Sequence, residues 1–284
     1  MTKEQAYLQA KKTLRQAGKE SPAFDAVCLC RKVFGLDRAG LAVHGQEAAP
    51  DADARELQRL AALRAGGEPL QYLLGVWPFL ELELAVGEGV LCPREETELL
   101  VRTAAQRLPQ GGRVLDLCAG SGAVGLGLAS LRPDLTVFCG EKFDGALRYL
   151  RENCCKYANL HVQPLQLDAF STEDAAACGK LDGFLCNPPY VEENEIPQLQ
   201  PELHFEPETA LDGGEDGLRF YRAIAQIWVP QVKPGGLCAV EIGESQAASV
   251  SGLFQSAGLR DVAVCRDFNA FDRVVYGFRG EKLV

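Results

Sequence analysis

The spacing of apolar residues predicts helices in the first quarter of the chain. Apolar positions recur three and four residues apart there, as in Tyr7, Ala10, Leu14 and Ala17, and this is the spacing of one helix face. Thr2 and Gln5 form a capping-box pattern, and Ser21-Pro22 is typical of a second helix start. We predict helices between Thr2 and Gly18, between Ser21 and Gly35 and from Asp51 to Ala65, with a short turn or helix around Arg38–His44.

The period changes from helical to alternating at residues 76–92. Leu80, Leu82, Leu84 and Val86 alternate with Glu81, Glu83 and Ala85, which predicts a half-buried strand. Gly87-Glu88-Gly89 predicts a turn, and Val90-Leu91-Cys92 a second strand. We therefore predict a β-hairpin that links two domains.

From Pro93 onward strand-like and helix-like segments alternate. Such alternation is typical of a mostly parallel sheet with helices on both faces, so the fold class is α/β and Rossmann-like. The predicted organisation is a helical domain at residues 1–75, a hairpin linker at 76–92 and a catalytic domain at 93–284. The predicted helices are 95–108, 123–131, 144–157, 216–232 and 246–257, and the seven predicted strands are 113–117, 135–140, 161–167, 183–186, 236–242, 262–267 and 273–278.

Composition narrows the possible functions. The chain has 284 residues, of which 47% are hydrophobic, and no apolar run approaches the ~20 residues of a membrane span. The first residues lack the apolar stretch of a signal peptide, so we expect a cytoplasmic location without membrane contact. We also expect a monomer. The net charge of −10 argues against stable nucleic-acid binding. The 11 cysteines form no Cys-x-x-Cys pair and several lie in apolar runs, so we expect buried free thiols, with neither a disulfide framework nor a metal.

Three acidic residues mark the ends of three successive predicted strands. Asp116 begins the loop Asp116-Leu117-Cys118-Ala119-Gly120-Ser121-Gly122, Glu141 ends the next strand, and Asp168 ends the third. A lone G-x-G loop is also common in simple tight turns, but the acids strengthen a binding interpretation. We expect Asp116 to bind a ligand ammonium group and Glu141 to accept hydrogen bonds from the ribose hydroxyls. We expect Asp168 to accept a hydrogen bond from an adenine amine. Acids there would repel a pyrophosphate, so the pattern favours a nucleoside without phosphate, and S-adenosyl-L-methionine (product S-adenosyl-L-homocysteine) fits.

The segment Asn187-Pro188-Pro189-Tyr190 follows the apolar run Gly183–Cys186. Two prolines force a rigid turn at the carboxyl edge of the predicted sheet, where ligands bind in open α/β folds. The Asn187 side-chain oxygen and the Pro188 carbonyl suit the two hydrogens of a planar substrate NH₂ group, and Tyr190 offers a flat apolar face. A plain surface turn is the alternative, since Asn-Pro pairs commonly begin turns. Beside a nucleoside site, the segment predicts methyl transfer to a planar nitrogen, with Asn187 near both cofactor and substrate.

These motifs resemble those of the release factor glutamine methyltransferases, the PrmC/HemK family, over nearly the whole chain. The matching segments are Gly67–Gly75, Pro93-Arg94-Glu95-Glu96-Thr97-Glu98, the loop at 116–122, Asn187–Tyr190, Phe205-Glu206-Pro207, Gly235-Gly236 with Glu241-Ile242-Gly243, and Asp272–Val275. The resemblance implies a class I methyltransferase fold and methylation of the side-chain amide nitrogen (N5) of the glutamine in the Gly-Gly-Gln motif of peptide chain release factors. It also implies catalytic roles for Asn187, Pro188, Pro189 and Tyr190, substrate binding by these residues and Glu206, and substrate recognition by the helical domain.

The chain departs from the family pattern at three places. Cys118-Ala119 replaces the usual Gly-Thr in the loop, and Glu141 stands where aspartate is usual. The segment 267–271 lacks the usual glycine before Asp272-Arg273, which changes the loop geometry there. Cofactor binding should survive the first two changes, because cysteine is small and glutamate is only one methylene longer.

Two other functions compete with this interpretation. The Asn-Pro-Pro-Tyr motif also occurs in adenine N6 methyltransferases that act on DNA or RNA, but these need a basic channel, and the net charge of −10 weighs against one. A binding protein that keeps the nucleoside site without turnover would tolerate the loss of Asn187, which this chain retains.

Overall fold

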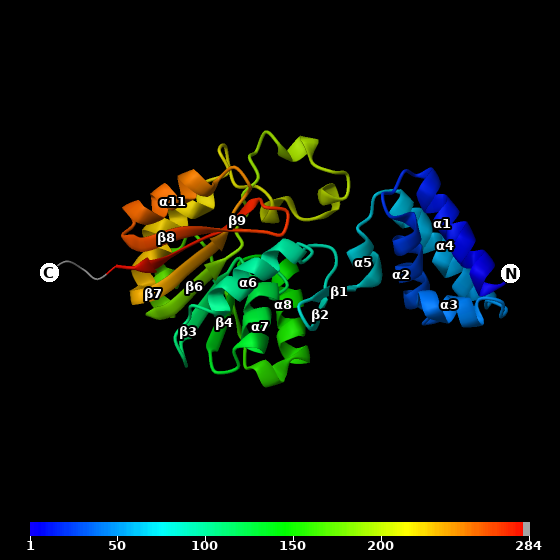
Figure 1. Ribbon diagram of the computed structural model, residues 1–284, viewed down its shortest axis with the longest axis horizontal. Helices are drawn as coiled ribbons and strands as arrows, with labels where there is room; N and C mark the ends of the chain where they lie inside the picture. Colours follow the sequence, from blue (N-terminus) through cyan, green and yellow to red (C-terminus); the bar gives the residue numbers. More distant parts are fainter. Residues whose placement is uncertain (281–284) are drawn as a thin grey trace. The chain divides into compact units, whose positions relative to one another are not determined.

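The protein is described here by a computed structural model that covers residues 1–280 (Figure 1). The chain forms two compact units. The N-terminal unit comprises Met1–Val76 together with Gln200–Phe205, and the second unit comprises the remaining described residues, beginning with Trp77–Leu199 and resuming at Glu206. Residues 200–205 therefore pack with the N-terminal unit, although the sequence pattern places them inside the catalytic domain at 93–284.

The N-terminal unit is helical, as predicted. Its first helix has the full capping box: the Thr2 hydroxyl accepts from the Gln5 N–H, and the Gln5 side chain accepts from the Thr2 N–H. The second helix ends at Gly35 in the left-handed conformation. A fifth short helix, which periodicity over so few residues cannot reveal, follows Pro69. The helices are α1 (Lys3–Gln16), α2 (Pro22–Phe34), α3 (Arg38–His44), α4 (Asp51–Ala65) and α5 (Leu70–Leu74).

An ion-pair cluster lies inside this unit. Arg64 Nε donates to Asp25 Oδ2 at 2.7 Å, and both side chains are at most 10% exposed. Arg64 Nη1 also lies 2.6 Å from Glu202 Oε1, and Lys19 Nζ lies 3.2 Å from the same oxygen. Because Glu202 belongs to the segment 200–205, these contacts explain why that segment packs with helices far from it in sequence.

The predicted hairpin exists but is shifted toward the N-terminus. Its strands are β1 (Val76–Phe79) and β2 (Leu82–Ala85), which pair as a two-stranded sheet. Leu80 turns the chain with a φ of 51°, so it ends the first strand instead of continuing the alternation. The prediction of a strand at Val90–Cys92 is wrong: these residues form no strand, and Val90 and Cys92 are buried in an irregular segment.

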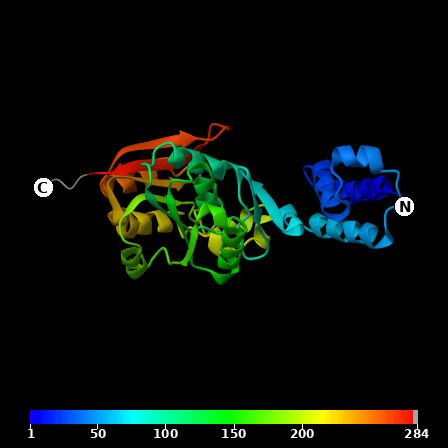
Figure 2. The same ribbon diagram turned by 90° about the horizontal axis from the view of Figure 1, so that it is seen from below.

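The second unit contains a β-sheet flanked by helices (Figures 1 and 2). The sheet has seven strands in the order β5-β4-β3-β6-β7-β9-β8. All neighbours pair in parallel except β9, which is antiparallel to β7 and β8. The predicted mixed, mostly parallel sheet is confirmed. The strands are β3 (Arg113–Leu117), β4 (Thr136–Glu141), β5 (Gln163–Gln166), β6 (Leu181–Cys186), β7 (Val232–Glu241), β8 (Leu259–Arg266) and β9 (Asp272–Arg279).

Two hydrophobic layers cover the two faces of this sheet, because successive side chains of a strand point to opposite faces. In β3, Val114 packs with α6, α7 and α8, whereas Leu115 packs on the other face. That second layer contains Trp228 and Phe254. The helices are α6 (Glu98–Ala105), α7 (Ala123–Leu131), α8 (Asp144–Lys156), α9 (Thr172–Cys178), α10 (Arg219–Ala223) and α11 (Ala247–Ser256).

The helix predictions for this unit are correct in position and less so in detail. The helix predicted at 95–108 begins as a 3₁₀ turn at Glu95–Thr97. The one predicted at 216–232 is α10 followed by a π-helix at Ile224–Trp228 and a 3₁₀ turn at Val229–Gln231. Helix α9 was not predicted, since seven residues rich in alanine carry no clear period. Short 3₁₀ turns also occur in this unit at Ile196–Gln198 and Glu208–Ala210, and another at Leu203–Phe205 belongs to the segment of the N-terminal unit.

Strand order reverses direction between β3 and β6. From β3 the chain continues outward through β4 to β5, then returns to place β6 on the opposite side of β3. The loops that follow β3 and β6 therefore leave the sheet edge next to one another and lead in opposite directions. Such a switch point is where open α/β sheets bind ligands. Within residues 1–280, no helix combines the length and apolar character needed to cross a bilayer.

Removal of Asp25 should destabilise the N-terminal unit. An Asp25→Ala variant leaves Arg64 buried with one carboxylate fewer, and breaking a buried pair of this kind typically costs about 3 kcal/mol. Amide hydrogen exchange in α2 and α4 should accelerate accordingly. The matched control is Glu56→Ala, which removes an exposed ion pair with Arg59 on the same helix and should leave exchange unchanged. Equal exchange in both variants would contradict the role given to the buried pair.

Candidate active site

A cavity of about 380 Å³ opens at the switch point. The segments that follow β3, β4, β5 and β6 all contribute to its lining, together with irregular segments at 89–94 and 207–212. The loop after β3 brings Cys118, Ala119, Gly120 and Ser121 to the cavity. One cavity therefore receives residues from four strand ends, as the sequence predicts for a ligand site at this edge.

The loop between β3 and α7 is held in a tight conformation by backbone hydrogen bonds. Ala119 N donates to the Gly140 carbonyl at 3.0 Å, and Gly122 N to the Ala119 carbonyl at 2.7 Å. Gly122 has a φ of 87°, and a Cβ there would lie 2.7 Å from Leu150 Cδ1, so only glycine fits. Cys118 has a φ of 57°, a left-handed conformation that costs a non-glycine residue roughly 1–2 kcal/mol.

Glu141, the last residue of β4, lines the cavity and organises the backbone around it. Its Oε2 accepts from Gly120 N at 3.0 Å, and its Oε1 accepts from Lys142 N at 2.8 Å and from Phe143 N at 2.9 Å. Burial raises the pKa of this carboxyl, and the three backbone hydrogen bonds oppose that shift. Since a carboxylate offers about four acceptor positions, Glu141 retains capacity for a ligand hydroxyl group.

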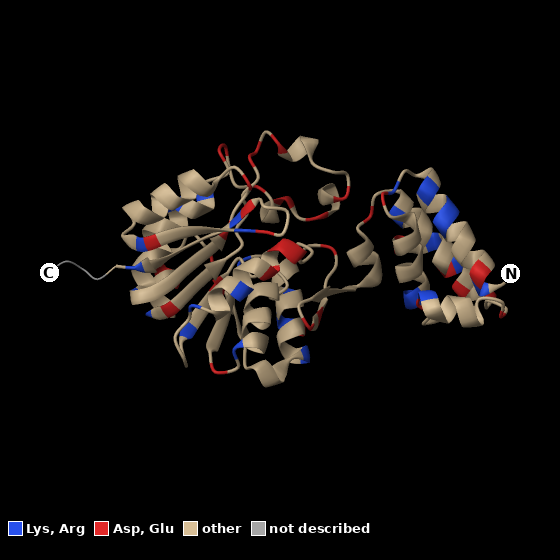
Figure 3. Cartoon of the chain, in the orientation of Figure 1, with Lys and Arg blue, Asp and Glu red and all other residues tan. Residues whose placement is uncertain are grey.

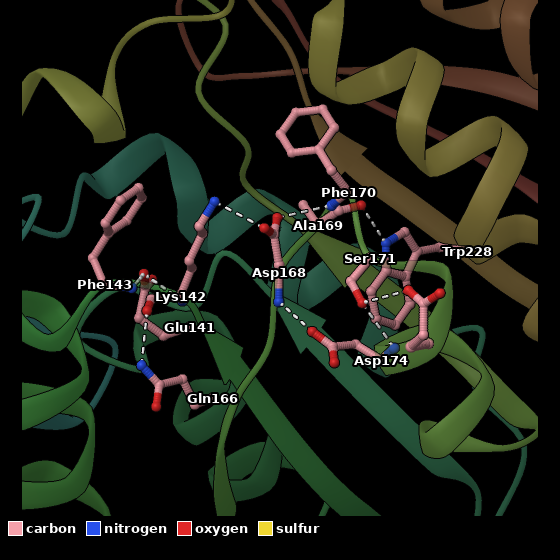
Figure 4. A network of polar contacts seen from close by, with 11 residues as sticks. Glu141, Lys142, Phe143, Gln166, Asp168, Ala169, Phe170, Ser171, Asp174 and Trp228 are labelled. Carbon is pink, nitrogen blue, oxygen red and sulfur yellow. Dashed lines mark hydrogen bonds and ion pairs between the residues drawn. The ribbon is translucent and has the colours of Figure 1, made fainter.

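Asp168 lies on the cavity wall two residues after β5 (Figure 4). Its Oδ2 is 2.8 Å from Lys142 Nζ, and its Oδ1 accepts from Phe170 N at 3.0 Å. The Asp168 N–H donates a hydrogen bond to Asp174 Oδ2 at 2.8 Å, and Trp228 Nε1 donates one to the Ala169 carbonyl at 2.8 Å. These contacts fix the loop after β5 from both sides. Lys142 lowers the pKa of Asp168 against the opposing effect of burial, so the carboxylate is charged at neutral pH.

Two aromatic residues on the cavity wall were missed from the sequence. Phe143 and Phe170 are 43% and 41% exposed, and each stands two residues after an acid that lines the cavity, Glu141 and Asp168 respectively. Figure 4 shows both rings beside the network of the acids. Exposed aromatic faces suit a flat ligand ring. The repeated spacing of acid, one residue, then phenylalanine is the sequence signal that could have identified them.

Asp116 does not line the cavity, contrary to its predicted role as the receiver of a ligand ammonium group. It is the fourth residue of β3, not a residue beyond its end, and its side chain is 1% exposed on the face covered by α7. Oδ2 accepts from Gly125 N at 2.9 Å, while Oδ1 has no hydrogen-bond partner. Burial raises its pKa to about 8. Asp116 therefore anchors α7 to the strand.

The turn after β6 brings Asn187 and Pro189 to the cavity, whereas Pro188 and Tyr190 do not line it. Asn187 Nδ2 donates to Thr97 Oγ1 at 3.2 Å. The Tyr190 ring packs against the hydrophobic layer that contains Trp228, and burial raises its pKa to about 12. The Tyr190 carbonyl accepts from Gln246 Nε2 at 3.0 Å. The turn is thus fixed by Tyr190 and presents Asn187 to the cavity.

Glu206 is a structural anchor in this arrangement. Its side chain is 2% exposed, forms an ion pair with Arg94 and accepts from Cys92 N at 2.9 Å. It does not line the cavity, so the structure does not place it where a substrate would contact it. Together with Arg94 it connects the irregular segment at 89–94 with the segment that begins at residue 206, and both segments contribute to the cavity wall.

The fold and the site define a methyltransferase of the Rossmann-like class I type. Residues 89–213 match the family described as the methyltransferase small domain, and residues 5–75 match the one described as the PrmC N-terminal domain. A methyltransferase from Pyrococcus furiosus shares the fold, with a TM-score of 0.51 and 14% identity over 71% of this chain and 91% of that chain.

Sequence similarity to named proteins identifies the particular family. The release factor glutamine methyltransferase of Geobacter sulfurreducens is 36% identical over 265 residues, 93% of this chain and 92% of the relative. That of Escherichia coli is 35% identical over 259 residues, 91% of this chain and 92% of the relative. The chain belongs to the family of release factor glutamine methyltransferases, and the predicted family is confirmed.

The left-handed conformation of Cys118 predicts an unusual order of stability among its variants. Cys118→Gly and Cys118→Ala both remove the thiol, but only glycine accommodates a φ of 57° freely. The glycine variant should be more stable to urea unfolding than the alanine variant by about 1 kcal/mol, whereas in ordinary backbone the alanine variant would be the more stable. Greater stability of the alanine variant would show that the loop relaxes to negative φ.

Proposed function

We propose that this protein transfers a methyl group from S-adenosyl-L-methionine to the side-chain amide nitrogen (N5) of the glutamine in the Gly-Gly-Gln motif of a peptide chain release factor. The observation that carries the proposal is that one cavity is lined by Asn187 and also by the 118–121 loop, Glu141 and Asp168. The family of the chain supports the substrate.

The cavity suits a nucleoside cofactor in its chemistry. Glu141 keeps acceptor capacity for ribose hydroxyls, Asp168 presents a charged carboxylate for an amine, and the rings of Phe143 and Phe170 suit the faces of a purine. The loop at 118–121 would hold the amino-acid portion. S-Adenosyl-L-methionine supplies a reactive methyl group on a sulfonium sulfur.

Asn187 recognises the substrate amide from the cavity wall. The proposed second acceptor is the carbonyl of Pro188, the next residue of the turn, whose side chain does not line the cavity. Each accepts one hydrogen of the substrate NH₂ group, which aims the nitrogen toward the cavity and restrains its rotation. The amide lone pair is delocalised in the ground state. Acceptors on both hydrogens favour the localised, pyramidal nitrogen of the transition state, so their contribution grows as the reaction proceeds. No catalytic base is needed to activate the nitrogen.

The N-terminal helical unit is the proposed recognition domain for the release factor, supported by its match to the PrmC N-terminal domain. The alternative of an adenine methyltransferase acting on nucleic acid is less favoured. Basic and acidic residues are both spread over the chain (Figure 3), and the net charge is −10. A nucleic-acid substrate would be attracted by a concentrated basic surface.

The direct test is mass spectrometry of a release factor after incubation with the protein and isotopically labelled S-adenosyl-L-methionine. A label on the glutamine of the Gly-Gly-Gln motif is the expected result. A release factor in which that glutamine is replaced by asparagine serves as the control. Label on DNA or RNA, with none on the release factor, would overturn the proposal in favour of the adenine methyltransferase.

Loss of the Glu141 carboxylate should weaken cofactor binding. Glu141→Ala removes the proposed ribose acceptor and also leaves the backbone N–H groups of Gly120, Lys142 and Phe143 without this partner. We expect a loss of about 1.5–3 kcal/mol in binding, the contribution of hydrogen bonds to a charged group. Isothermal titration calorimetry checks it, with Glu173→Ala, an exposed acid on α9, as the control. Unchanged affinity in Glu141→Ala would place the ribose elsewhere.

Loss of the Asn187 side chain should act on turnover more than on the Michaelis constant. The amide interaction strengthens in the transition state, and preorganised groups of this type contribute about 10²–10³ in rate. Single-turnover methylation at saturating cofactor should therefore fall by that factor in Asn187→Ala. Asn187→Asp keeps an acceptor but loses the amide group that donates to Thr97. Its single-turnover rate should therefore lie between the rates of the wild type and of Asn187→Ala. An alanine variant within about tenfold of wild type would contradict the acceptor role.

A further inference from the structure

A buried carboxylate lies directly beside the catalytic asparagine at the end of the neighbouring strand. Strands β6 and β7 are parallel and pair Cys186 with Val240, so the next residues along each strand, Asn187 and Glu241, leave the sheet side by side. Glu241 is 2% exposed and does not line the cavity. Its Oε2 is buried without a hydrogen-bond partner. A buried, incompletely paired carboxylate is costly and calls for an explanation.

Thr97 completes the cluster from another element. It lies in the 3₁₀ turn that precedes α6, is 3% exposed, and accepts from Asn187 Nδ2 at 3.2 Å. The Glu241 carboxylate lies beside Asn187 by strand register, and interactions with Thr97 and Asn187 lower its pKa against the larger, opposing effect of burial. Three polar side chains from three segments thus lie together at the edge of the cavity, which Thr97 and Asn187 line.

This network determines which way the Asn187 amide faces. A side-chain amide has two donor hydrogens on nitrogen and one acceptor oxygen, and rotation by 180° about the last bond exchanges them. Thr97 Oγ1 accepts from the nitrogen at 3.2 Å, and the register of β6 and β7 places the Glu241 carboxylate beside the same amide. The flipped arrangement would direct the Asn187 oxygen at a carboxylate, where two acceptors repel. Glu241 therefore keeps Oδ1 available for a substrate hydrogen.

We propose that Thr97 and Glu241 are positioning residues for methyl transfer: they hold the Asn187 amide nitrogen from behind and so orient its oxygen toward the substrate amide. This inference rests on the proposed function, and deepens it by assigning a role to two buried residues, of which Thr97 lines the cavity and Glu241 does not. The negative charge on Glu241 also polarises the Asn187 amide, which makes Oδ1 a stronger acceptor.

The charged form of Glu241 is required for this role, so methylation should depend on pH. Burial raises the pKa of Glu241 to about 7. Arg273 on β9 and the hydrogen bonds from Thr97 and Asn187 favour the charged form, whereas Glu96 from the turn before α6 disfavours it. Tyr190 also faces Glu241, and the Tyr221 hydroxyl donates to its carbonyl at 2.9 Å. Turnover should fall as the pH drops through the pKa of Glu241.

The kinetic test compares Glu241→Gln with the matched control Glu244→Gln, the same change at an exposed position three residues away. Glu241→Gln should reduce single-turnover methylation of a release factor about 10- to 100-fold above neutral pH, the size expected for hydrogen bonds to a charged group. It should also abolish the acid limb of the pH profile and leave the Michaelis constant for the release factor little changed. Thr97→Val should reduce the rate, and Thr97→Ser, which keeps the hydroxyl, should restore it.

A second measurement is independent of activity. The side-chain NH₂ signals of Asn187 in ¹⁵N NMR spectra, assigned by their loss in Asn187→Asp, should shift in one step as Glu241 titrates. The step should vanish in Glu241→Gln. Two results would overturn the positioning role. One is that Glu241→Gln still shows the step in the Asn187 NH₂ signals, and the other is that its pH–rate profile keeps the acid limb of the wild type. If the wild-type enzyme does not methylate release factors at all, the proposed function fails, and the NMR titration alone decides the network.

Discussion

The parallel pairing of β3 with β6 is the constraint on which the rest of the site depends. These two strands are more than 60 residues apart in the sequence, yet Leu117 and Cys186 are register partners at their carboxyl ends. The loop that begins at Cys118 and the turn that begins at Asn187 therefore start from adjacent positions. A one-residue slip of either strand would turn its side chains to the opposite face and separate the loop from the turn.

The buried polar groups around this pairing have an energetic cost that the fold tolerates. Burial raises the pKa of Asp116 to about 8 and that of Glu241 to about 7, so the folded chain binds these protons more tightly than the unfolded chain does. Stability from these groups therefore falls as the pH rises from the unfolded pKa of each carboxyl toward its folded value. Burying these two carboxyl groups costs free energy, so each should have a role besides packing. Asp116 anchors α7, and Glu241 lies beside Asn187.

Periodicity and turn residues were sufficient to predict most of the architecture but not the positions of all the site residues. β3, α4 and α7 were predicted with the bounds that the structure gives, whereas α3 was predicted only as a short turn or helix around the same residues. The hairpin was shifted because the turn falls at Leu80, a residue without turn preference. Asp116 was misplaced for a different reason: a residue near a strand end faces either the helix layer or the open edge, and only the register decides which.

The features that could not be predicted from the sequence depend on contacts between segments that are distant along the chain. Nothing in the local sequence of Glu206 shows that Arg94 and Cys92 will surround it, or that residues 200–205 will join the helical unit through Glu202. Thr97 and Glu241 lie in motifs that the family resemblance identified. Their common role depends on three segments that converge behind Asn187, a property of the folded chain alone.

Cys118 and Glu141, two residues that differ from those usual in the family, show which contacts determine the conformation of the loop at 116–122. Cys118 adopts positive φ although glycine is usual there, so conformational freedom at this position is not what shapes the loop. Hydrogen bonds from Ala119 and Gly120 to the end of β4 hold the backbone instead, and the second of these ends on Glu141. Glutamate reaches one methylene farther than aspartate. At the end of β4 its carboxylate accepts from Lys142 N and Phe143 N and also from Gly120 N, and this last bond holds the backbone two residues after Cys118.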